Sequence, residues 1–371
     1  MKAKKVIFYG ALGYPGEKVV GGGEAGNHKS IKVLESLGLE IACVYKPYPK
    51  KGVFRSLQYA IRLFAIVPKL FFKLMDREIV GLHVSGFYQH LIYQEFCLLL
   101  VGRILGKQLI YELRGGGVEE AYNHRTGLYR FFFKRAVLLA NVVLSQGEKY
   151  TTFLERLGAK NVVFYPNFID SRLFLKAKTQ RSRIDEDVLT VNLVYFGRFS
   201  ETKNIDFIID VFDLLSHKSD LFSLELIGSG EDKYMEKIRY KIAEKGLLAQ
   251  VKISPPIFGN RLFDALGDKH FFLFPTNEPR EGHSNALTEA MGLGLVPICS
   301  AVGFNSEIVS MPELVIPEFV PQEFASRIWE IWTAGTWKTY SDAVKCRVHS
   351  QFTESRARSI LSDVYVKLLL K

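Results

Sequence analysis

The chain has 371 residues, with 49 Lys plus Arg against 39 Asp plus Glu and a formal net charge of +10 at pH 7. This length exceeds one ordinary hydrophobic core and predicts two α/β domains of moderate size. The four cysteines, Cys43, Cys97, Cys299 and Cys346, lack metal-ligand spacing and indicate a reducing compartment. No apolar run has the length of a membrane span and no leader pattern opens the chain, so we expect neither secretion nor a membrane-spanning segment.

Positive charge is concentrated in the first half of the chain. Residues 1–170 hold 24 Lys plus Arg and 13 Asp plus Glu, whereas residues 171–371 hold 25 and 26. A basic half joined to a neutral half indicates that one domain alone meets an anionic surface. That surface could be nucleic acid, a lipid-linked phosphate or an anionic membrane.

Apolar runs of strand length alternate with helix-length segments along the chain. The first set lies at residues 5–10, 40–45, 79–84, 108–113, 142–145 and 161–165, and the second at 191–196, 222–227, 251–254, 271–275 and 296–300. This alternation predicts two parallel sheets, each covered by helices on both faces. Residues 166–190 are expected to be a linker and a polar loop, and residues 353–371 have the spacing of a helix at Ile360, Leu361, Val364, Tyr365 and Leu368.

The loop after the first strand carries Gly21, Gly22 and Gly23 before a predicted helix. Glycines of this kind let backbone amides approach a phosphate or an acceptor sugar. They are consecutive and distant from the strand, so they do not form a dinucleotide fingerprint. At the end of the strand 79–84, His83 either lines a cleft or packs in the interior, and the sequence favours neither.

Two basic and aromatic segments predict contact with a membrane surface. The cations Arg55, Arg62, Lys69 and Lys73 are spaced by seven, seven and four residues and are flanked by Phe54, Leu63, Phe64, Leu70, Phe71 and Phe72. Pro68 is expected to kink this helix. A second cluster places Arg130, Lys134 and Arg135 beside three phenylalanines. Such segments suit an interfacial helix, and the alternative is ordinary packing helices whose charges are solvated.

In the second half, the strand 191–196 is predicted to end at Phe196, with Gly197 in a tight turn. Arg198 and Lys203 then flank a loop before a helix that starts at Asn204. Two cations in such a loop could bind a diphosphate, although isolated cations after a strand are more often solvated surface. Gly228 and Gly230 are expected in a turn after the next strand.

The segment 275–294 is predicted to hold two carboxylates at a helix start. Gly282 reads as a turn, and Ser284 or its neighbour as the cap of a short helix that ends at Gly292 and Gly294. The amides and positive dipole end of such a helix favour a diphosphate. Glu289 is placed for hydrogen bonds from a ribose and Glu281, in the turn, for the transferred sugar.

These residues resemble the family 4 retaining glycosyltransferases. The shared pattern reads Pro275, Glu281, Gly282, Glu289, Ala290, Met291 and Gly294, and the family's Gly-Arg…Lys element is matched by Gly197, Arg198 and Lys203. The family's hinge is matched by Asn167 and Asp170, with Phe168 where Gly is common. The resemblance implies a GT-B architecture of two facing Rossmann-like domains and an interdomain cleft. The domains are residues 1–166 with a helix of 353–371 crossing back, for the acceptor, and 167–352, for the donor.

The resemblance also implies roles for single residues. Catalysis falls to Glu281, Arg198 and Lys203. Donor binding falls to Gly22, Gly23, Gly197, Gly228, Gly282, His283, Ser284, Asn285, Ala286, Leu287 and Glu289, with His283 shaping the sugar pocket. Candidates on the acceptor side are Glu24, His83, Glu112 and Arg114. The strand 108–113 departs from many relatives, which place a His or Asp near its end, so the identity of an acceptor-side base stays open.

The function implied is a metal-independent, hexosyl-type transfer with retention, from a nucleotide-diphosphate sugar to a saccharide. A UDP-sugar is favoured over a GDP-sugar, and the acceptor is expected on polyprenyl diphosphate in O-antigen, capsule or exopolysaccharide synthesis. No cofactor and no nucleic acid is expected, and the triplet 185–187 reads as a solvated segment rather than a metal site. The expected location is cytoplasmic, peripheral to the inner face of the membrane through the first domain.

Other classes of protein fit less well. A nicotinamide oxidoreductase needs a Gly-x-Gly-x-x-Gly turn directly after a strand with an acid about twenty residues on, and this chain lacks that acid. Two alternatives remain open at this stage. They are a catalytically inert glycosyltransferase-like scaffold and a basic nucleic-acid-binding protein.

Overall fold

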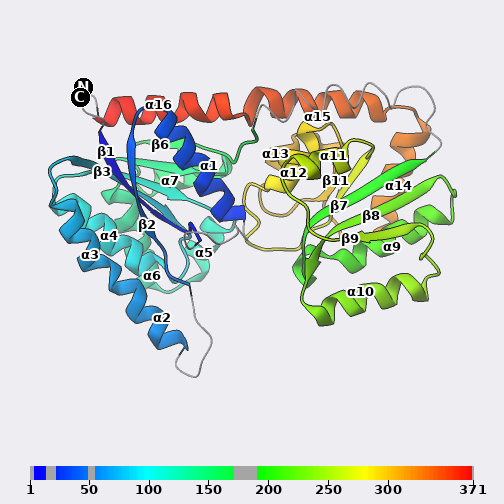
Figure 1. Ribbon diagram of the computed structural model, residues 1–371, viewed down its shortest axis with the longest axis horizontal. Helices are drawn as coiled ribbons and strands as arrows, with labels where there is room; N and C mark the ends of the chain where they lie inside the picture. Colours follow the sequence, from blue (N-terminus) through cyan, green and yellow to red (C-terminus); the bar gives the residue numbers. More distant parts are fainter. Residues whose placement is uncertain (1–3, 14–21, 49–54, 171–189, 370–371) are drawn as a thin grey trace. The chain divides into compact units, whose positions relative to one another are not determined.

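The computed structural model describes residues 4–13, 22–48, 55–170, 190–369, which form two compact units. Unit 1 comprises Met1–Asn167 with Ser355–Lys371, and unit 2 comprises Phe168–Glu354. The triplet 185–187 and Gly21 lie outside the described residues. Figure 1 shows the elements of each unit in order along the chain.

Unit 1 is built on a six-stranded parallel sheet in the order β2-β1-β3-β4-β5-β6. Its strands are β1 Lys5–Gly10, β2 Glu40–Tyr45, β3 Ile79–Gly86, β4 Gln108–Leu113, β5 Val142–Ser145 and β6 Val162–Phe164. The central strands β1, β3 and β4 are almost wholly buried, which explains their continuous apolar sequences.

Helices cover both faces of the unit 1 sheet, with α3, α4 and α6 on one side and α1 and α16 on the other (Figure 1). Their bounds are α1 Gly22–Ser36, α2 Arg55–Phe64, α3 Ile66–Leu74, α4 Ile92–Ile104, α5 Val118–His124, α6 Gly127–Leu139, α7 Lys149–Arg156 and α16 Glu354–Leu369. The predicted kink is present as a break between α2 and α3 at Ala65. The break lies one turn before Pro68, which has no N–H to donate to the Phe64 carbonyl.

Unit 2 is built on a second six-stranded parallel sheet in the order β12-β11-β10-β7-β8-β9. Its strands are β7 Val191–Phe199, β8 Phe222–Gly230, β9 Val251–Ser254, β10 Phe271–Phe274, β11 Val296–Ser300 and β12 Val315–Ile316. The sequence did not predict the two-residue strand β12. Two parallel sheets with covering helices confirm the expected α/β fold class.

Two strands of unit 2 continue past their predicted ends. Gly197 and Gly228 were expected in turns, but they pair with each other inside β7 and β8. A Cβ on Gly228 would overlap the carbonyl oxygen of Gly197 and lie 2.5 Å from the Phe199 ring. Glycine is therefore needed here for close approach of the two strands and not for a turn.

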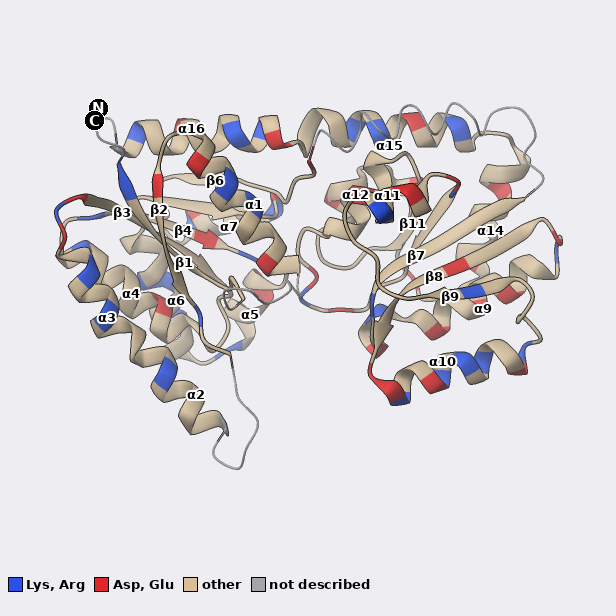
Figure 2. Ribbon diagram, in the orientation of Figure 1, with Lys and Arg blue, Asp and Glu red and all other residues tan. Residues whose placement is uncertain are grey.

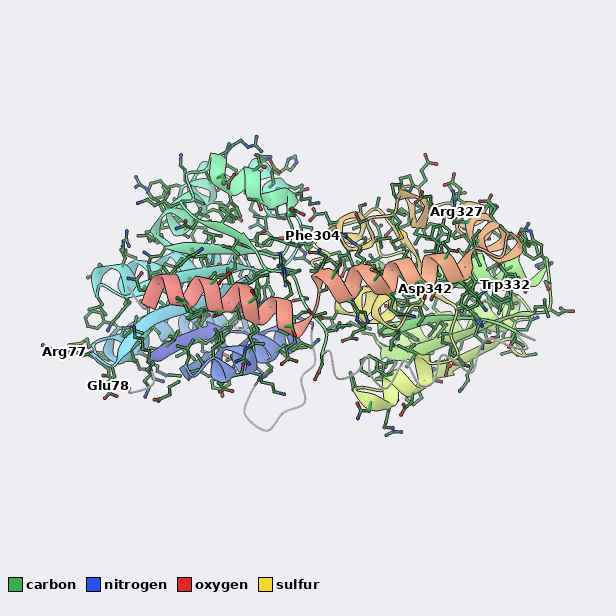
Figure 3. The ribbon with its side chains drawn as sticks, turned by 90° about the horizontal axis from the view of Figure 1, so that it is seen from above. Arg77, Glu78, Phe304, Arg327, Trp332 and Asp342 are labelled. Atoms are coloured by element: carbon green, nitrogen blue, oxygen red, sulfur yellow. The ribbon has the colours of Figure 1, made fainter. Side chains whose placement is uncertain are left out.

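The helices of unit 2 lie on both faces of its sheet. They are η1 Glu201–Lys203, α9 Ile205–Ser216, α10 Asp232–Glu244, α11 Asn260–Leu266, α12 Asn285–Gly292, α13 Asn305–Val309, η2 Pro312–Leu314, α14 Pro321–Thr333 and α15 Trp337–Gln351. Helix α14 packs on α9, and α15 packs on α12. Trp332, which is labelled in Figure 3, lies near the end of α14. Its ring stacks on Trp337 at the start of α15, with centroids 6.0 Å apart.

A buried polar network fixes the last helix to the unit 1 sheet. His83 on β3 has a partner at each ring nitrogen. Its Nδ1 lies 2.9 Å from the Tyr365 hydroxyl on α16, and its Nε2 lies 3.0 Å from the Glu112 carboxylate on β4. The second carboxylate oxygen of Glu112 pairs with Arg114 at 2.7 Å, and Arg114 Nη1 donates to Asn167 at 3.1 Å. The helix that closes the chain and the residue that leaves unit 1 are thus held by one set of side chains.

Glu112→Gln should destabilise the protein by about 3 kcal/mol or more at pH 7, because it leaves the buried Arg114 without a counter-charge. Burial raises the pKa of Glu112, but the charge of Arg114 and the hydrogen bond with His83 outweigh it and lower the pKa. The stabilising contribution is therefore present above the ordinary carboxyl pKa and is lost as pH falls through the lower folded value. Urea unfolding of parent and variant at a series of pH values measures this.

Glu119→Gln is the matched control, because Glu119 pairs with Arg156 on the surface at 3.0 Å. Its loss should cost at most about 1 kcal/mol. Equal stability of the two variants at pH 7 would contradict a structural role for the network.

Candidate active site

The candidate site of unit 2 lies where β7 and β10 end side by side. The two strands are neighbours in the sheet, so the loop after β7 meets the loop after β10. Asn277 N–H donates to the Thr202 carbonyl at 2.7 Å, and the Thr202 hydroxyl donates to Glu278 at 3.1 Å. Ligands of open parallel sheets bind at this carboxyl edge of the strands.

An ion pair between Lys203 and Glu281 forms the centre of this site. The Thr276 hydroxyl also donates to Glu281 Oε2 at 3.0 Å, and Lys203 Nζ lies 5.2 Å from the centroid of the Phe274 ring. Glu281 is 9% exposed, so the carboxylate is held with little contact to solvent. A cation and a carboxylate placed in this way could each exchange their partner for a group of a ligand.

The turn that carries Glu281 depends on a glycine from another loop. Gly303 has a φ of +65°, and a Cβ at this position would overlap the carbonyl oxygen of Glu281. Glu281 N–H also donates to the Glu278 carbonyl at 2.9 Å. The backbone of the turn is thus fixed from both sides.

Helix α12 begins at Asn285, four residues after Glu281, and is capped by Ser284, as the sequence predicted. The Ser284 hydroxyl accepts from Leu287 N–H at 3.3 Å. Asn285 and Ala286 open the helix and are half-buried, and Glu289 follows one turn later on the face of Asn285. The start of α12 therefore presents amides, a positive dipole end and a carboxylate together.

Arg198 lies near the end of β7 with an exposed side chain, next to the exposed Gly197. Within the described part of the chain, no ion pair of Arg198 is present. The structure therefore brings Lys203 and Glu281 into contact and places the exposed Arg198 near the end of the neighbouring strand β7.

Residues 190–334 match the family described as Glycosyl transferases group 1. The matched range runs from the start of β7 to the end of α14 and contains Arg198, Lys203, Glu281 and Glu289. Unit 2 belongs to the group 1 glycosyltransferases.

Similar proteins agree with this assignment. A capsular polysaccharide biosynthesis glycosyltransferase, CapH of Staphylococcus aureus, is 31% identical over 143 residues, which is 37% of this chain and 38% of that protein. The GDP-mannose:cellobiosyl-diphosphopolyprenol alpha-mannosyltransferase of Xanthomonas campestris is 23% identical over 64% of this chain and 60% of its own length. The chain thus aligns with about four tenths to six tenths of the length of these relatives.

Solved structures confirm the GT-B fold of the whole chain. Sucrose-phosphate synthase of Thermosynechococcus elongatus superposes with a TM-score of 0.76 at 16% identity over 99% of both chains. HepE of Anabaena, in complex with UDP and glucose, superposes with a TM-score of 0.69 at 16% identity over 97% of this chain and 98% of that one.

His283 of the group 1 domain points into the protein interior. It is 4% exposed, and its ring meets Phe352, at the end of α15, with centroids 4.7 Å apart. Burial, followed by the charge of Arg347, lowers the pKa of His283 to about 3, so the ring is neutral at physiological pH. The His283 side chain thus packs in the interior, and its expected role in shaping a sugar pocket stays a prediction.

The acceptor-side candidates divide into two groups. His83, Glu112 and Arg114 are 0%, 0% and 2% exposed and belong to the network that holds α16. Glu24 is half-buried in the first turn of α1, where its carboxylate accepts from the Tyr48 hydroxyl. Gly22 and Gly23 open the same helix.

Sequence reasoning missed several residues at both sheet edges. Thr276 donates to Glu281, and its place directly after an apolar strand and Pro275 was an available signal. Lys46 and Tyr48 follow β2 directly, yet they stand outside any pattern that the sequence offered.

The described residues hold neither a clustered metal site nor a membrane-spanning helix. No group of three or more His, Cys, Asp or Glu side chains there is arranged to hold a metal ion. In the same residues, no helix combines the length and apolar character needed to cross a bilayer.

Gly303→Ala should disturb the Glu281 turn of the group 1 domain. The added Cβ overlaps the Glu281 backbone, so we expect about 1–3 kcal/mol of destabilisation beyond the cost of the left-handed conformation itself. Gly335→Ala is the control, because Gly335 has a φ of +67° with no atom within 4 Å of an added Cβ. Urea unfolding compares the two, and equal losses would show that the Gly303 contact does not matter.

Proposed function

We propose that the protein is a retaining glycosyltransferase that moves a sugar from a nucleotide-diphosphate sugar to a saccharide acceptor in the synthesis of a bacterial surface polysaccharide. The observation that carries this proposal is the Lys203–Glu281 pair beside the start of α12. A fixed cation, a helix amino terminus and two carboxylates are the groups that a nucleotide sugar needs. A catalytically inert scaffold would keep the same binding groups and lack turnover.

The chemistry follows from where charge develops. When the bond between the sugar and the diphosphate breaks, negative charge grows on the leaving oxygen while the acceptor hydroxyl attacks from the same face. Lys203, Arg198 and the amides at the start of α12 stabilise that charge without reorganising. Lys203 then changes partner, from Glu281 to the donor's phosphate.

The two glutamates take different parts in this scheme. Glu281 is fixed by Lys203 and Thr276 and accepts hydrogen bonds from the hydroxyls of the transferred sugar. Glu289, one turn into α12, accepts from the ribose. No step needs a metal ion or another cofactor, so chelation with EDTA should leave turnover unchanged.

The names of the relatives support particular substrates. HepE is described in complex with UDP and glucose, and the Xanthomonas relative is named for GDP-mannose. We propose a UDP-sugar as donor, with a GDP-sugar as the second choice. The Xanthomonas protein is named for a diphosphopolyprenol-linked acceptor and the Staphylococcus protein for capsule synthesis, and both support a polyprenyl-diphosphate-linked saccharide here.

A thermal-shift panel of nucleotide sugars tests the donor site. A ligand present at 100 times its dissociation constant should add about 2.7 kcal/mol of stability to the parent. Glu289→Ala should lose most of this shift for the same ligand because the ribose contact is gone. Failure of every nucleotide sugar to stabilise the parent, or an unchanged shift in Glu289→Ala, would contradict the assignment.

Turnover separates the remaining roles of the same site. Glu281→Ala should lower kcat more than it weakens donor binding, whereas Arg198→Ala and Lys203→Ala should each cost on the order of 10² to 10³ in rate. Tight donor binding without turnover in the parent would identify the inert scaffold.

Unit 1 also carries a basic and apolar surface, formed by α2, α3 and α6. The sequences of these helices contain Lys and Arg but no Asp or Glu, and the ribbon in Figure 2 is blue at places along α2 and α3 and nowhere red. Exposed apolar side chains accompany them, namely Leu57, Ile61, Phe64, Phe72, Leu128 and Phe131. Leu63 and Leu70 are buried, so part of the predicted stripe belongs to the core. We propose that this surface binds the anionic inner face of the cytoplasmic membrane.

Co-sedimentation with vesicles that contain anionic lipid tests this surface. Each exposed cation near such a membrane contributes about 1 kcal/mol, so changing Arg62, Lys69, Lys73 and Lys134 together to Glu should abolish sedimentation. The control changes four exposed cations of unit 2, Lys218, Lys233, Arg239 and Arg261, to Glu. Equal binding by the two variants, or no binding by the parent at low salt, would contradict the proposal.

A further inference from the structure

Four side chains meet at the carboxyl edge of the unit 1 sheet. They are Glu24 in the first turn of α1, Lys46 and Tyr48 directly after β2, and Phe87 directly after β3. We call them the carboxyl-edge cluster. The strands β2, β1 and β3 are neighbours in the sheet, so these segments lie together although they are far apart in sequence.

The Lys46 ammonium lies beside two aromatic rings. Its Nζ is 4.7 Å from the Phe87 ring centroid and 5.8 Å from that of Tyr48. Burial lowers the pKa of Lys46, and the charges of Glu95 and Glu24 offset only part of that effect. Within the described residues the ammonium has neither an ion pair nor a hydrogen-bond acceptor. A half-buried cation without such a partner is able to bind an anionic group of a ligand.

The nearby carboxylates are engaged by other donors. Glu95 accepts from the Phe87 N–H at 2.8 Å and from the Tyr111 hydroxyl at 2.5 Å, and burial raises its pKa. Glu24 accepts from the Tyr48 hydroxyl. Among the described residues, no acceptor therefore takes the three N–H donors of Lys46, which can bind a ligand.

The backbone around the carboxyl-edge cluster is held by contacts from neighbouring segments. Glu95 anchors the Phe87 backbone, and a Cβ on Gly86 would come within 2.6 Å of the Glu95 carboxylate. A Cβ on Gly23 would lie 2.9 Å from Phe87 Cζ, so the start of α1 packs directly on this ring. The ring that faces Lys46 is thus held from two sides.

We propose that the carboxyl-edge cluster binds the phosphate and the attached sugar of the carrier-linked acceptor. The Lys46 ammonium binds this phosphate. The proposal rests on the proposed function and names the acceptor group that unit 1 recognises. A compact ammonium with three donors suits phosphate oxygens, and the positive end of α1 lies beside it. The Tyr48 and Phe87 rings offer apolar faces to a sugar, and the Glu24 carboxylate can accept from a sugar hydroxyl.

Isothermal titration with farnesyl diphosphate, a soluble prenyl diphosphate, tests the cluster in the full-length protein. Saturating UDP is present in every titration to occupy the donor site. Lys46→Met keeps the apolar stem and removes the charge, and its dissociation constant should be about 10- to 100-fold weaker than that of the parent. Lys46→Arg should keep most of the affinity. Lys32→Met, which removes an exposed lysine of α1, should bind like the parent.

Three further ligands identify the group that is recognised. Inorganic pyrophosphate should bind more weakly than farnesyl diphosphate but with the same dependence on Lys46. Farnesol should show no dependence on Lys46. Glucuronate binding that depends on Lys46, without such dependence for farnesyl diphosphate, would replace phosphate by a sugar carboxylate and overturn the proposal.

Folding and donor binding are measured on the same variants. Lys46→Met should melt at the same or a higher temperature than the parent, because it removes a desolvated charge, and it should keep the thermal shift with UDP. Equal affinity of parent and Lys46→Met for farnesyl diphosphate would overturn the proposal. Failure of UDP to stabilise the parent would instead count against the donor site, and the pyrophosphate and farnesyl diphosphate titrations, repeated in Lys203→Met, would still decide the role of Lys46.

Discussion

The buried network around Arg114 is the constraint on which the arrangement of the chain depends. The polypeptide leaves unit 1 after Asn167 and returns with α16, and both segments are bonded to the same few side chains of β3 and β4. A guanidinium this deep in the core needs its carboxylate and its hydrogen-bond acceptors, since an unpaired charge there would cost several kcal/mol. The last helix is accordingly part of the first unit's core, although it is made last.

The candidate donor site also depends on a pair of opposite charges. Lys203 and Glu281 neutralise each other in a half-buried place, and so the site keeps a cation and a carboxylate in position before any ligand arrives. Preorganised groups of this kind lose little freedom when a ligand binds. In unit 1, by contrast, Lys46 has rings for neighbours and no carboxylate partner among the described residues. The cation at one sheet edge is thus paired with a carboxylate, whereas the cation at the other lies beside aromatic rings.

The sequence predicted the two sheets well because almost every strand is apolar enough to be buried on both faces. It missed β12, since Val315–Ile316 is too short to form a recognisable run. It assigned Gly197 and Gly228 to turns, because only the packed structure shows that one strand's backbone approaches the other at these points. The break at Ala65 was predictable, because Pro68 cannot donate a hydrogen bond to the carbonyl four residues before it.

The sequence predicts which residues belong to the candidate site, but not which of them are in contact. Glu281, Glu289 and Lys203 could be singled out from motifs, but the pairing of Lys203 with Glu281 follows from β10 lying beside β7, which no local pattern encodes. His83 was left undecided for the same reason. Its partner Tyr365 is 282 residues away, and only tertiary structure shows that the pair is buried.

The parallel bridge between Ile169 and Thr353 places the beginning and the end of unit 2 next to each other. Ile169 N–H donates to the Phe352 carbonyl at 2.9 Å, and Glu354 N–H donates to the Ile169 carbonyl at 3.2 Å. Along the chain, unit 2 is inserted into unit 1. The segments at its beginning and its end are joined by backbone hydrogen bonds. A module whose ends adjoin can be exchanged as a single insertion, so unit 2 could be replaced during evolution while the fold of unit 1 is retained.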